Sequence, residues 1–114
     1  MKILGIGVDI IQNNRIKNSI KNHKFRDRIF SYNELKLSSS SKNKIGYFSK
    51  RFAAKEAFAK ALGIGFRNNL NFKDIEIMND KLGKPYYSKT KKIRQIIKKE
   101  FKVKNFNCFL SISD

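Results

Sequence analysis

Residues 51–63 read Arg-Phe-Ala-Ala-Lys-Glu-Ala-Phe-Ala-Lys-Ala-Leu-Gly, and this stretch decides the fold. Alanine and phenylalanine recur in it at helical spacing, and Gly63 is of the residue type that commonly ends a helix. We therefore predict the strongest helix of the chain over residues 47–62, mostly buried. Glu56 and Lys60 lie four residues apart and so share one side of this helix. Because packed helix surfaces rarely carry charges without a reason, the pair indicates a functional site.

A second carboxylate lies near the start of the chain. Apolar residues alternate with others over residues 2–11, which predicts a first strand. One face of that strand carries Gly5, Gly7 and Asp9. Without Cβ atoms, the two glycines would let a ligand or another backbone approach the face that Asp9 shares. An ordinary role for Asp9, capping the next turn, remains the alternative.

The remaining elements follow from local patterns. We expect a short helix around Ile16 and Ile20, a helix begun by the capping box of residues 31–34, a loop at 38–41, a strand at 72–78, a turn at 79–85, an extended segment from Tyr86, an amphipathic helix at 93–101 and a last strand at 106–112. Strands mixed with helices of unequal length predict an α+β fold, with a mainly antiparallel sheet packed against a long central helix and shorter helices.

Composition limits the class of protein. A chain of 114 residues suits one domain, residues 1–114, and its hydrophobic fraction of 40% can supply a core. It has no apolar run near the roughly 20 residues that span a bilayer, and no secretory signal pattern, so we expect a cytoplasmic protein without a membrane partner. One cysteine, Cys108, and one histidine, His23, form no His/Cys metal cluster. We expect Cys108 in the core and His23 at the surface.

The chain is strongly basic, with 26 Lys and Arg against 9 Asp and Glu and a formal charge of +17. This charge suits a polyanionic partner such as RNA, a phosphorylated cofactor or an acidic protein. It also suits a compositional bias toward lysine at tolerant surface positions. The charge alone therefore identifies no partner.

Asp9 and Glu56 together suggest metal chemistry. A Mg²⁺ ion held by two carboxylates keeps open positions for water and phosphate oxygens, and Lys60 would lie one helical turn away. This arrangement suits phosphoryl-group chemistry, in which positioning and charge neutralisation do most of the work. The alternative for Glu56 and Lys60 is an ordinary surface pair that stabilises the helix by ~0.2–0.5 kcal/mol.

Three motifs in this order resemble a known family. Gly5-x-Gly7-x-Asp9, the helix motif of residues 51–63 and Gly83-Lys84-Pro85 resemble the holo-[acyl-carrier-protein] synthases, the small bacterial trimeric class of the 4′-phosphopantetheinyl transferases. The resemblance extends over essentially the whole chain. It implies an enzyme of fatty acid biosynthesis that moves 4′-phosphopantetheine from coenzyme A to a serine of apo acyl carrier protein and releases adenosine 3′,5′-bisphosphate.

The resemblance also assigns roles to residues. Asp9 and Glu56 would be the Mg²⁺ ligands, Glu56 would accept the serine proton directly or through a bound water, and Lys60 would contact the pyrophosphate or assist proton transfer. Asp9, Glu56 and Lys60 are thus the expected catalytic residues. The residues expected at coenzyme A are Arg51, Lys60, Gly63, Gly83, Lys84, Pro85, Ser111 and Asp114.

The family further implies two protein contacts. Acyl carrier proteins are acidic, and the basic docking surface of the family matches Arg15, Lys24, Phe25 and Arg28 here. Family members are homotrimers with the active site between subunits. Where they continue into a further strand, this sequence ends at Ser111-Ile112-Ser113-Asp114, which makes trimer formation and coenzyme A affinity points to test.

Two other hypotheses compete with the transferase. A small basic RNA- or ribosome-binding protein would explain the charge of +17, but it would not explain Asp9 and Glu56 on otherwise small or apolar faces. An inactive homologue that retains the fold is the other alternative. The transferase hypothesis predicts no nucleic acid partner.

Overall fold

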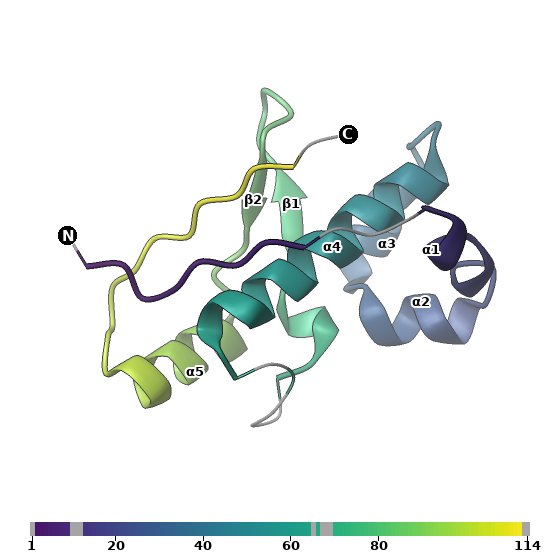
Figure 1. The fold of residues 1–114 in the computed structure, drawn as a ribbon. Coiled ribbons are helices and arrows are strands. Elements are labelled where there is room, and N and C mark those ends of the chain that lie inside the picture. The colour runs from purple at the N-terminus through teal and green to yellow at the C-terminus, as the bar shows by residue number, and fades with distance from the viewer. Residues whose placement is uncertain (1, 10–12, 65, 67–69, 113–114) are drawn as a thin grey trace.

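The computed structural model describes residues 2–9, 13–64, 66 and 70–112. Its elements, in chain order, are α1 (Asn13–Ser19), α2 (His23–Ile29), α3 (Tyr32–Ser38), α4 (Lys44–Leu62), the 3₁₀ helix η1 (Phe72–Asp74), β1 (Ile77–Asn79), β2 (Pro85–Tyr87) and α5 (Lys91–Phe101) (Figure 1). The helices and the small antiparallel sheet confirm the predicted α+β class.

Helix α4 is the central element and has both ends capped by its own sequence. The Asn43 side chain accepts a hydrogen bond from the Gly46 N–H at 3.0 Å, so the helix begins at Lys44, three residues before the predicted start. Gly63 ends it in the left-handed conformation, with φ of 75°. The prediction of a long helix closed by Gly63 is confirmed.

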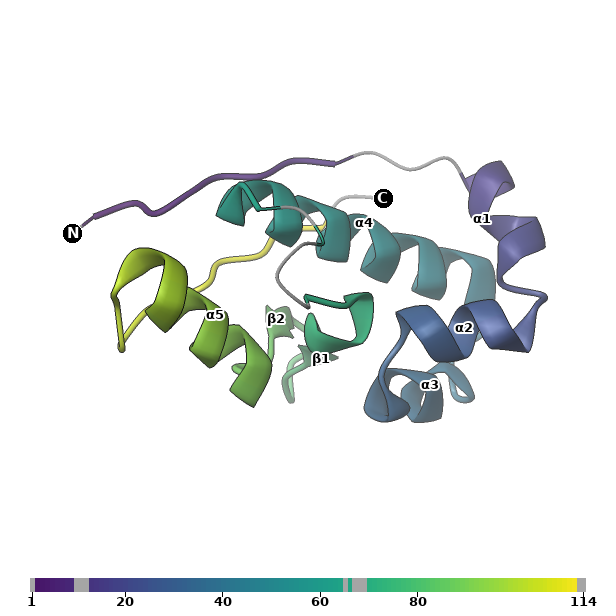
Figure 2. The ribbon, with the colours of Figure 1, turned by 90° about the horizontal axis from the view of Figure 1, so that it is seen from below.

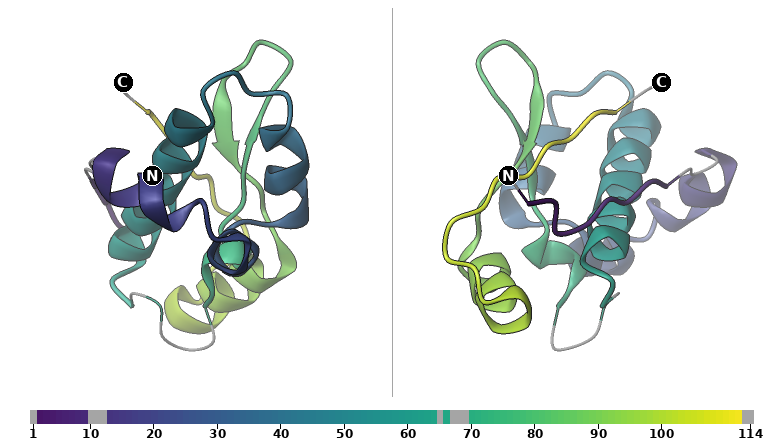
Figure 3. Two further views of the ribbon diagram at one scale, coloured as in Figure 1. Left: turned by 90° about the vertical axis from the view of Figure 1, so that its right-hand side faces the viewer. Right: turned by 60° about the vertical axis from the view of Figure 1, so that its left-hand side comes forward.

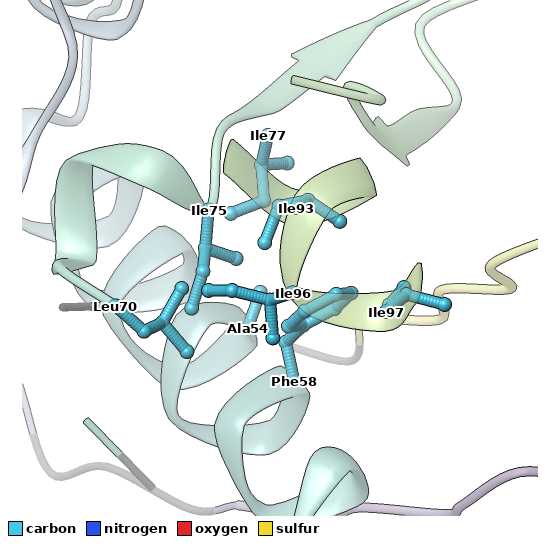
Figure 4. Packing of buried hydrophobic residues seen from close by; sticks show 8 residues of the cluster. All are labelled: Ala54, Phe58, Leu70, Ile75, Ile77, Ile93, Ile96 and Ile97. Carbon is cyan, nitrogen blue, oxygen red and sulfur yellow. The ribbon is translucent and has the colours of Figure 1, made fainter. Parts of the chain in front are cut away.

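Two apolar clusters pack against α4. One joins the helix to the sheet and α5 and consists of Ala54, Phe58, Leu70, Ile75, Ile77, Ile93, Ile96 and Ile97 (Figure 4). The other lies under α1, α2 and the first turns of α4 and consists of Ile16, Ile20, Ile29, Phe30 and Phe48. Seen from below, α5 and the group α1–α3 therefore lie at opposite ends of α4 (Figure 2). The helix is a shared wall of both clusters.

The sheet is a hairpin. β1 pairs with β2 antiparallel, with Ile77 opposite Tyr87 and Asn79 opposite Pro85. Asp80 Oδ1 closes the turn by accepting from the backbone N–H groups of Leu82 and Lys84, both at 2.9 Å. Gly83 adopts φ of 85°, a conformation open mainly to glycine. The predicted turn at 79–85 and the extended segment after it are confirmed.

Three predicted strands differ from the structure. Residues 2–9 and 106–112 are irregular segments that form no strand. The strand predicted at 72–78 is preceded by the 3₁₀ turn of η1, and β1 begins only at Ile77. The Asp74 carboxylate bends that turn by accepting from the Asn71 N–H at 2.9 Å. An alternating pattern also suits a segment with one side against a helix, and the N-terminal segment takes that place along α4 (Figure 3). Residues 10 and 11 of the first predicted strand lie outside the described residues.

Among the described residues, no helix combines the length and the apolar character that crossing a bilayer requires.

Candidate active site

The N-terminal segment lies directly on the backbone of α4. A Cβ built on Gly5 would overlap the carbonyl oxygen of Ala61, and one built on Gly7 would overlap that of Ala57. The obstacle is backbone, which cannot move aside as a side chain could. Of the two predicted reasons for the glycines, the approach of a ligand or of another backbone, the structure shows the second.

This close approach brings Asp9 to Lys60. The Lys60 Nζ donates to Asp9 Oδ1 at 2.5 Å and also reaches the Val8 carbonyl oxygen at 3.3 Å. The Asp9 side chain is 17% exposed and the Lys60 side chain 55% exposed, so the pair lies at the edge of the packed surface. The direct contact between these two residues was not predicted, because they lie 51 positions apart in the sequence and only the fold brings them together.

Glu56 belongs to the same side of α4. It is partly buried and precedes Lys60 by one helical turn. The N-terminal segment crosses α4 at Ala61 and then Ala57, running toward the start of the helix, and Asp9 bonds Lys60, one helical turn after Glu56 on the same side. The three residues predicted to be catalytic are thus brought to one side of the central helix.

This donor set suits a hard cation. Mg²⁺ typically binds one or two protein carboxylates and fills its other positions with water and phosphate oxygens. Among the described residues, no three His, Cys, Asp or Glu side chains gather as a metal cluster would require. Two carboxylates beside an ammonium therefore fit Mg²⁺ with a phosphate ligand better than they fit an all-protein zinc site.

A large open groove lies beside this site. It is enclosed by residues 2–9, one side of α4 and the C-terminal segment 103–112, and its volume is about 2130 Å³. Asp9, Lys50 and Ser111 are among its lining residues. Apolar side chains on the two segments remain exposed: Ile3, Ile6, Val8 and Phe109 are 68%, 77%, 72% and 88% exposed.

Arg51 points into the protein. Its guanidinium lies 3.7 Å from the Tyr47 ring centroid, and Nη2 donates to Asn79 Oδ1 at 2.5 Å. The side chain is 7% exposed, and burial lowers its pKa from the usual value, partly opposed by Tyr47 and Glu34. Its Nε has no hydrogen-bond partner within the described part of the chain. Coenzyme A binding by Arg51 stays a prediction.

The other residues expected at coenzyme A occupy separate places. Gly63 ends α4, and Gly83, Lys84 and Pro85 lie at the hairpin turn (Figure 1). Ser111 lines the groove, whereas Asp114 lies outside the described residues. Gly63, Gly83, Lys84 and Pro85 are not among the lining residues of the groove, whereas Tyr87 of β2 is.

The residues predicted to dock a carrier protein lie on α1 and α2. Lys24 and Arg28 are exposed on α2, and the Arg28 guanidinium carbon lies 5.9 Å from the Phe25 ring centroid. Phe25 is partly buried against Phe52, with ring centroids 6.3 Å apart. Arg15 belongs to α1, and its side chain lies outside the described structure.

A buried ion pair was missed by the sequence analysis. Lys55 and Glu34 are fully buried, and Lys55 Nζ donates to Glu34 Oε1 at 2.7 Å. Burial lowers the pKa of Lys55, and the neighbouring Glu34 opposes this shift. The capping box that begins at Ser31 was predicted and is confirmed, but its Glu34 serves the lysine as well. The sequence pattern gave no separate role to Lys55, the residue before Glu56.

His23 occupies the place predicted for it, whereas Cys108 lies at the edge of the core and not within it. His23 is exposed at the start of α2. Cys108 is partly buried against the cluster around α4 and α5, and burial raises the pKa of its thiol.

The fold and the site define a small α+β protein in which Glu56 and Lys60 of the central helix lie on the side that Asp9 of the N-terminal segment contacts. The chain belongs to the 4′-phosphopantetheinyl transferase superfamily, whose family model matches residues 5–110.

Relatives agree with this assignment. The chain is 61% identical over 114 residues to the holo-[acyl-carrier-protein] synthase of Pelagibacter ubique, covering 100% of this chain and 89% of that protein. A solved holo-[acyl-carrier-protein] synthase from Neisseria meningitidis has a TM-score of 0.81 at 37% identity, covering 88% of this chain and 82% of that one. One from Bacillus anthracis, in complex with CoA (3′,5′-ADP), has a TM-score of 0.69 at 42% identity over 75% of each chain. The predicted family and enzyme class are confirmed.

Proposed function

We propose that this chain transfers 4′-phosphopantetheine from coenzyme A to a serine hydroxyl of apo acyl carrier protein. The observation that carries the proposal is the gathering of Asp9, Glu56 and Lys60 on one side of α4, with Lys60 bonded to Asp9 at 2.5 Å. Two carboxylates and an ammonium on one surface supply metal ligation, proton acceptance and charge neutralisation, which phosphoryl transfer requires. The names of the relatives support the substrate pair.

In the proposed reaction, the serine oxygen forms a bond to the phosphorus that carries the pantetheine arm. The bond from that phosphorus to adenosine 3′,5′-bisphosphate breaks, and the bisphosphate takes the electron pair. Glu56 accepts the serine proton, directly or through a water molecule. Lys60, which is 55% exposed, remains accessible to a pyrophosphate oxygen while it holds Asp9 in place.

Asp9 and Glu56 would hold Mg²⁺ in this proposal. When bound, the ion would neutralise charge on the pyrophosphate and stabilise the leaving phosphate. Asp9 is suited to the task because its carboxylate is mostly shielded and already oriented by Lys60.

The groove and the basic helices would bind the two substrates. Ser111 and the hairpin turn with Lys84 are the candidates to contact coenzyme A, together with Arg51. At the opposite end of α4 from α5, Lys24 and Arg28 of α2 offer exposed cations around Phe25 to an acidic carrier protein. Such contacts raise the rate of association and weaken in salt.

We further propose that the chain works as a homotrimer in the cytoplasm and in fatty acid biosynthesis. Exposed Ile6 and Phe109 beside the open groove support association, because a second copy would remove apolar surface from water. The groove is larger than the roughly 300–1,000 Å³ of common ligand pockets, which leaves room for both a cofactor and part of a neighbouring chain.

A transfer assay tests the function. The protein is incubated with a bacterial apo acyl carrier protein and coenzyme A, in the presence of Mg²⁺ or of a chelator. The mass of the carrier protein is then measured by mass spectrometry. We expect a mass gain of one phosphopantetheine only with Mg²⁺. No gain at high protein concentration would contradict the proposal and favour an inactive homologue.

Asp9→Asn and Glu56→Gln test the assignments separately. Each should abolish Mg²⁺-dependent transfer while leaving the circular dichroism spectrum unchanged. Retained activity in either variant would remove that residue from the metal site.

A further inference from the structure

Lys55 uses every donor of its ammonium inside the protein. Nζ donates to Glu34 Oε1 at 2.7 Å, to the Phe72 carbonyl oxygen at 2.9 Å and to the Ile75 carbonyl oxygen at 2.5 Å. A lysine ammonium has three N–H donors, so all of them are satisfied. The three acceptors come from α3, from η1 and from the segment between η1 and β1, which together surround the end of the side chain.

The main acceptor is itself fixed. Glu34 Oε2 accepts from the Ile77 N–H of β1 at 2.9 Å, and Oε1 also accepts from the Ser31 N–H at 2.9 Å. The carbonyl oxygen of Glu34 accepts from the Tyr47 hydroxyl at 2.5 Å, a second link to α4. The acceptors of the lysine thus all lie outside α4, so a turn of α4 about its axis would strain or break these hydrogen bonds.

Lys55 also lies opposite the candidate active site. With 3.6 residues per helical turn, Lys55 and Ala57 point about 160° apart and Lys55 and Lys60 about 140° apart. Ala57 is the residue on which Gly7 lies, and Lys60 is the residue that binds Asp9. Asp9 lies only four residues before α1, whose Ile16 shares a cluster with residues outside α4. A rotation of α4 that Lys55 prevents would therefore move Glu56 and Lys60 relative to Asp9.

We propose that Lys55, with Glu34 as its counterion, is a positioning residue that fixes the rotation of α4 so that Glu56 and Lys60 face Asp9. This role rests on the proposed transferase function. Lys55 contacts neither the groove nor the reacting groups, and it acts through the helix backbone. A displacement of about 1 Å in a reacting group costs on the order of 100-fold in rate, so a small rotation is enough to matter.

The test uses the double variant Glu34→Gln/Lys55→Met. Removing both charges avoids leaving one buried without its partner, and the new side chains have similar length. Lys44→Met, on the exposed first turn of α4, is the matched control. Circular dichroism and urea unfolding identify the temperature at which each variant is fully folded.

Two measurements are made on the folded protein. The first separates kcat from the KM values of both substrates, and we expect kcat to fall about 10- to 100-fold with both KM values nearly unchanged, because binding surfaces are untouched. The second is independent of activity: the nuclear Overhauser contact between a Gly7 Hα proton and the Ala61 amide proton should weaken. Lys44→Met should leave both measurements as in the parent protein.

The outcomes separate the two proposals. A folded double variant with parental kcat and an unchanged Overhauser contact would overturn the positioning role while leaving the function standing. An inactive parent whose Overhauser contact is lost in the double variant would overturn the function and support the positioning. Should the double variant not fold, Lys55→Arg replaces it, because a planar guanidinium does not match three converging acceptors; unchanged kcat there would also overturn the role.

Discussion

Gly7 is the residue at which the N-terminal segment comes closest to α4. Its missing side chain leaves room for the Ala57 carbonyl oxygen, and the Ala61 amide nitrogen would lie 2.8 Å from an added Cβ. Since both groups are helix backbone, no movement of a neighbouring side chain can relieve the overlap that a larger residue at position 7 would cause. The position of Asp9, two residues later, depends on this contact.

We expect Gly7→Ala to lower the free energy of unfolding by about 1–3 kcal/mol, the usual cost of overpacking, and to reduce transfer activity by displacing Asp9. Urea denaturation and the transfer assay measure the two effects. Lys2→Ala, at an exposed position of the same segment, is the control and should change stability by less than about 0.5 kcal/mol. Wild-type stability in Gly7→Ala would contradict the close packing.

Lys55 provides a second residue-scale prediction. Lys55→Met alone leaves the Glu34 carboxylate buried without its counterion, so we expect a loss of about 3–5 kcal/mol in the free energy of unfolding. Glu34→Gln in the same chain should recover part of that loss, because the buried site then carries no charge. Urea unfolding of both variants checks this; equal stability of the single and double variants would show that the two charges are not coupled.

The site residues differ in how far the sequence reveals them. Asp9, Glu56 and Lys60 stand out because each is a charge on a small or apolar face. Lys55 gives no such signal, since in sequence it is one of many lysines and its partner Glu34 lies 21 positions away. Its burial becomes visible only when α3, η1 and β1 close around it. The Asp9–Lys60 bond was missed for the same reason.

At the scale of elements, the helices and the turn were predictable because their signals are local. Gly63, the capping box at Ser31 and the hairpin turn each involve a few adjacent residues. The strands predicted at 2–11 and 106–112 depend on partners that alternation cannot specify. Residues 2–9 satisfy their pattern by placing one side on α4. The turn of η1 displaced the start of the third strand because Asp74 caps it.

The basic surface of α1 and α2 gives a prediction for these elements. Arg15→Glu together with Arg28→Glu should raise the KM for acyl carrier protein about tenfold, equivalent to roughly 1.4 kcal/mol of binding, and leave the KM for coenzyme A unchanged. Steady-state kinetics at low and physiological salt measure both constants. Lys98→Glu together with Lys99→Glu on α5 is the matched control, because it makes the same charge change at the other end of α4. Equal effects of the two pairs would indicate a response to net charge alone.

The whole molecule presents apolar side chains that a single copy leaves in water. Ile6 and Phe109 border the same groove and are 77% and 88% exposed. Each side chain that becomes fully buried contributes about 1.5–3 kcal/mol, so association through this surface would be favourable. The proposed trimer would therefore account for the exposed apolar side chains of the two segments.

We expect light scattering to give the mass of three chains for the parent protein and a lower mass for Ile6→Lys, because a buried ammonium without a partner opposes association. Leu82→Lys is the control: Leu82 is 94% exposed at the hairpin turn, away from the groove, and its change should leave the mass unaltered. A monomeric parent, or an Ile6→Lys variant with the parental mass, would contradict assembly through the groove.

The contact between Asp9 and Lys60 joins positions 51 residues apart, and the glycines that allow it rest on helix backbone as late as Ala61. During synthesis, residues 2–9 therefore leave the ribosome well before the helix on which they dock has been made. The N-terminal segment must stay unpaired through that interval and close over the helix afterwards. Asp9 is made long before its partner Lys60, so it would reach its working place only after the central helix has been made.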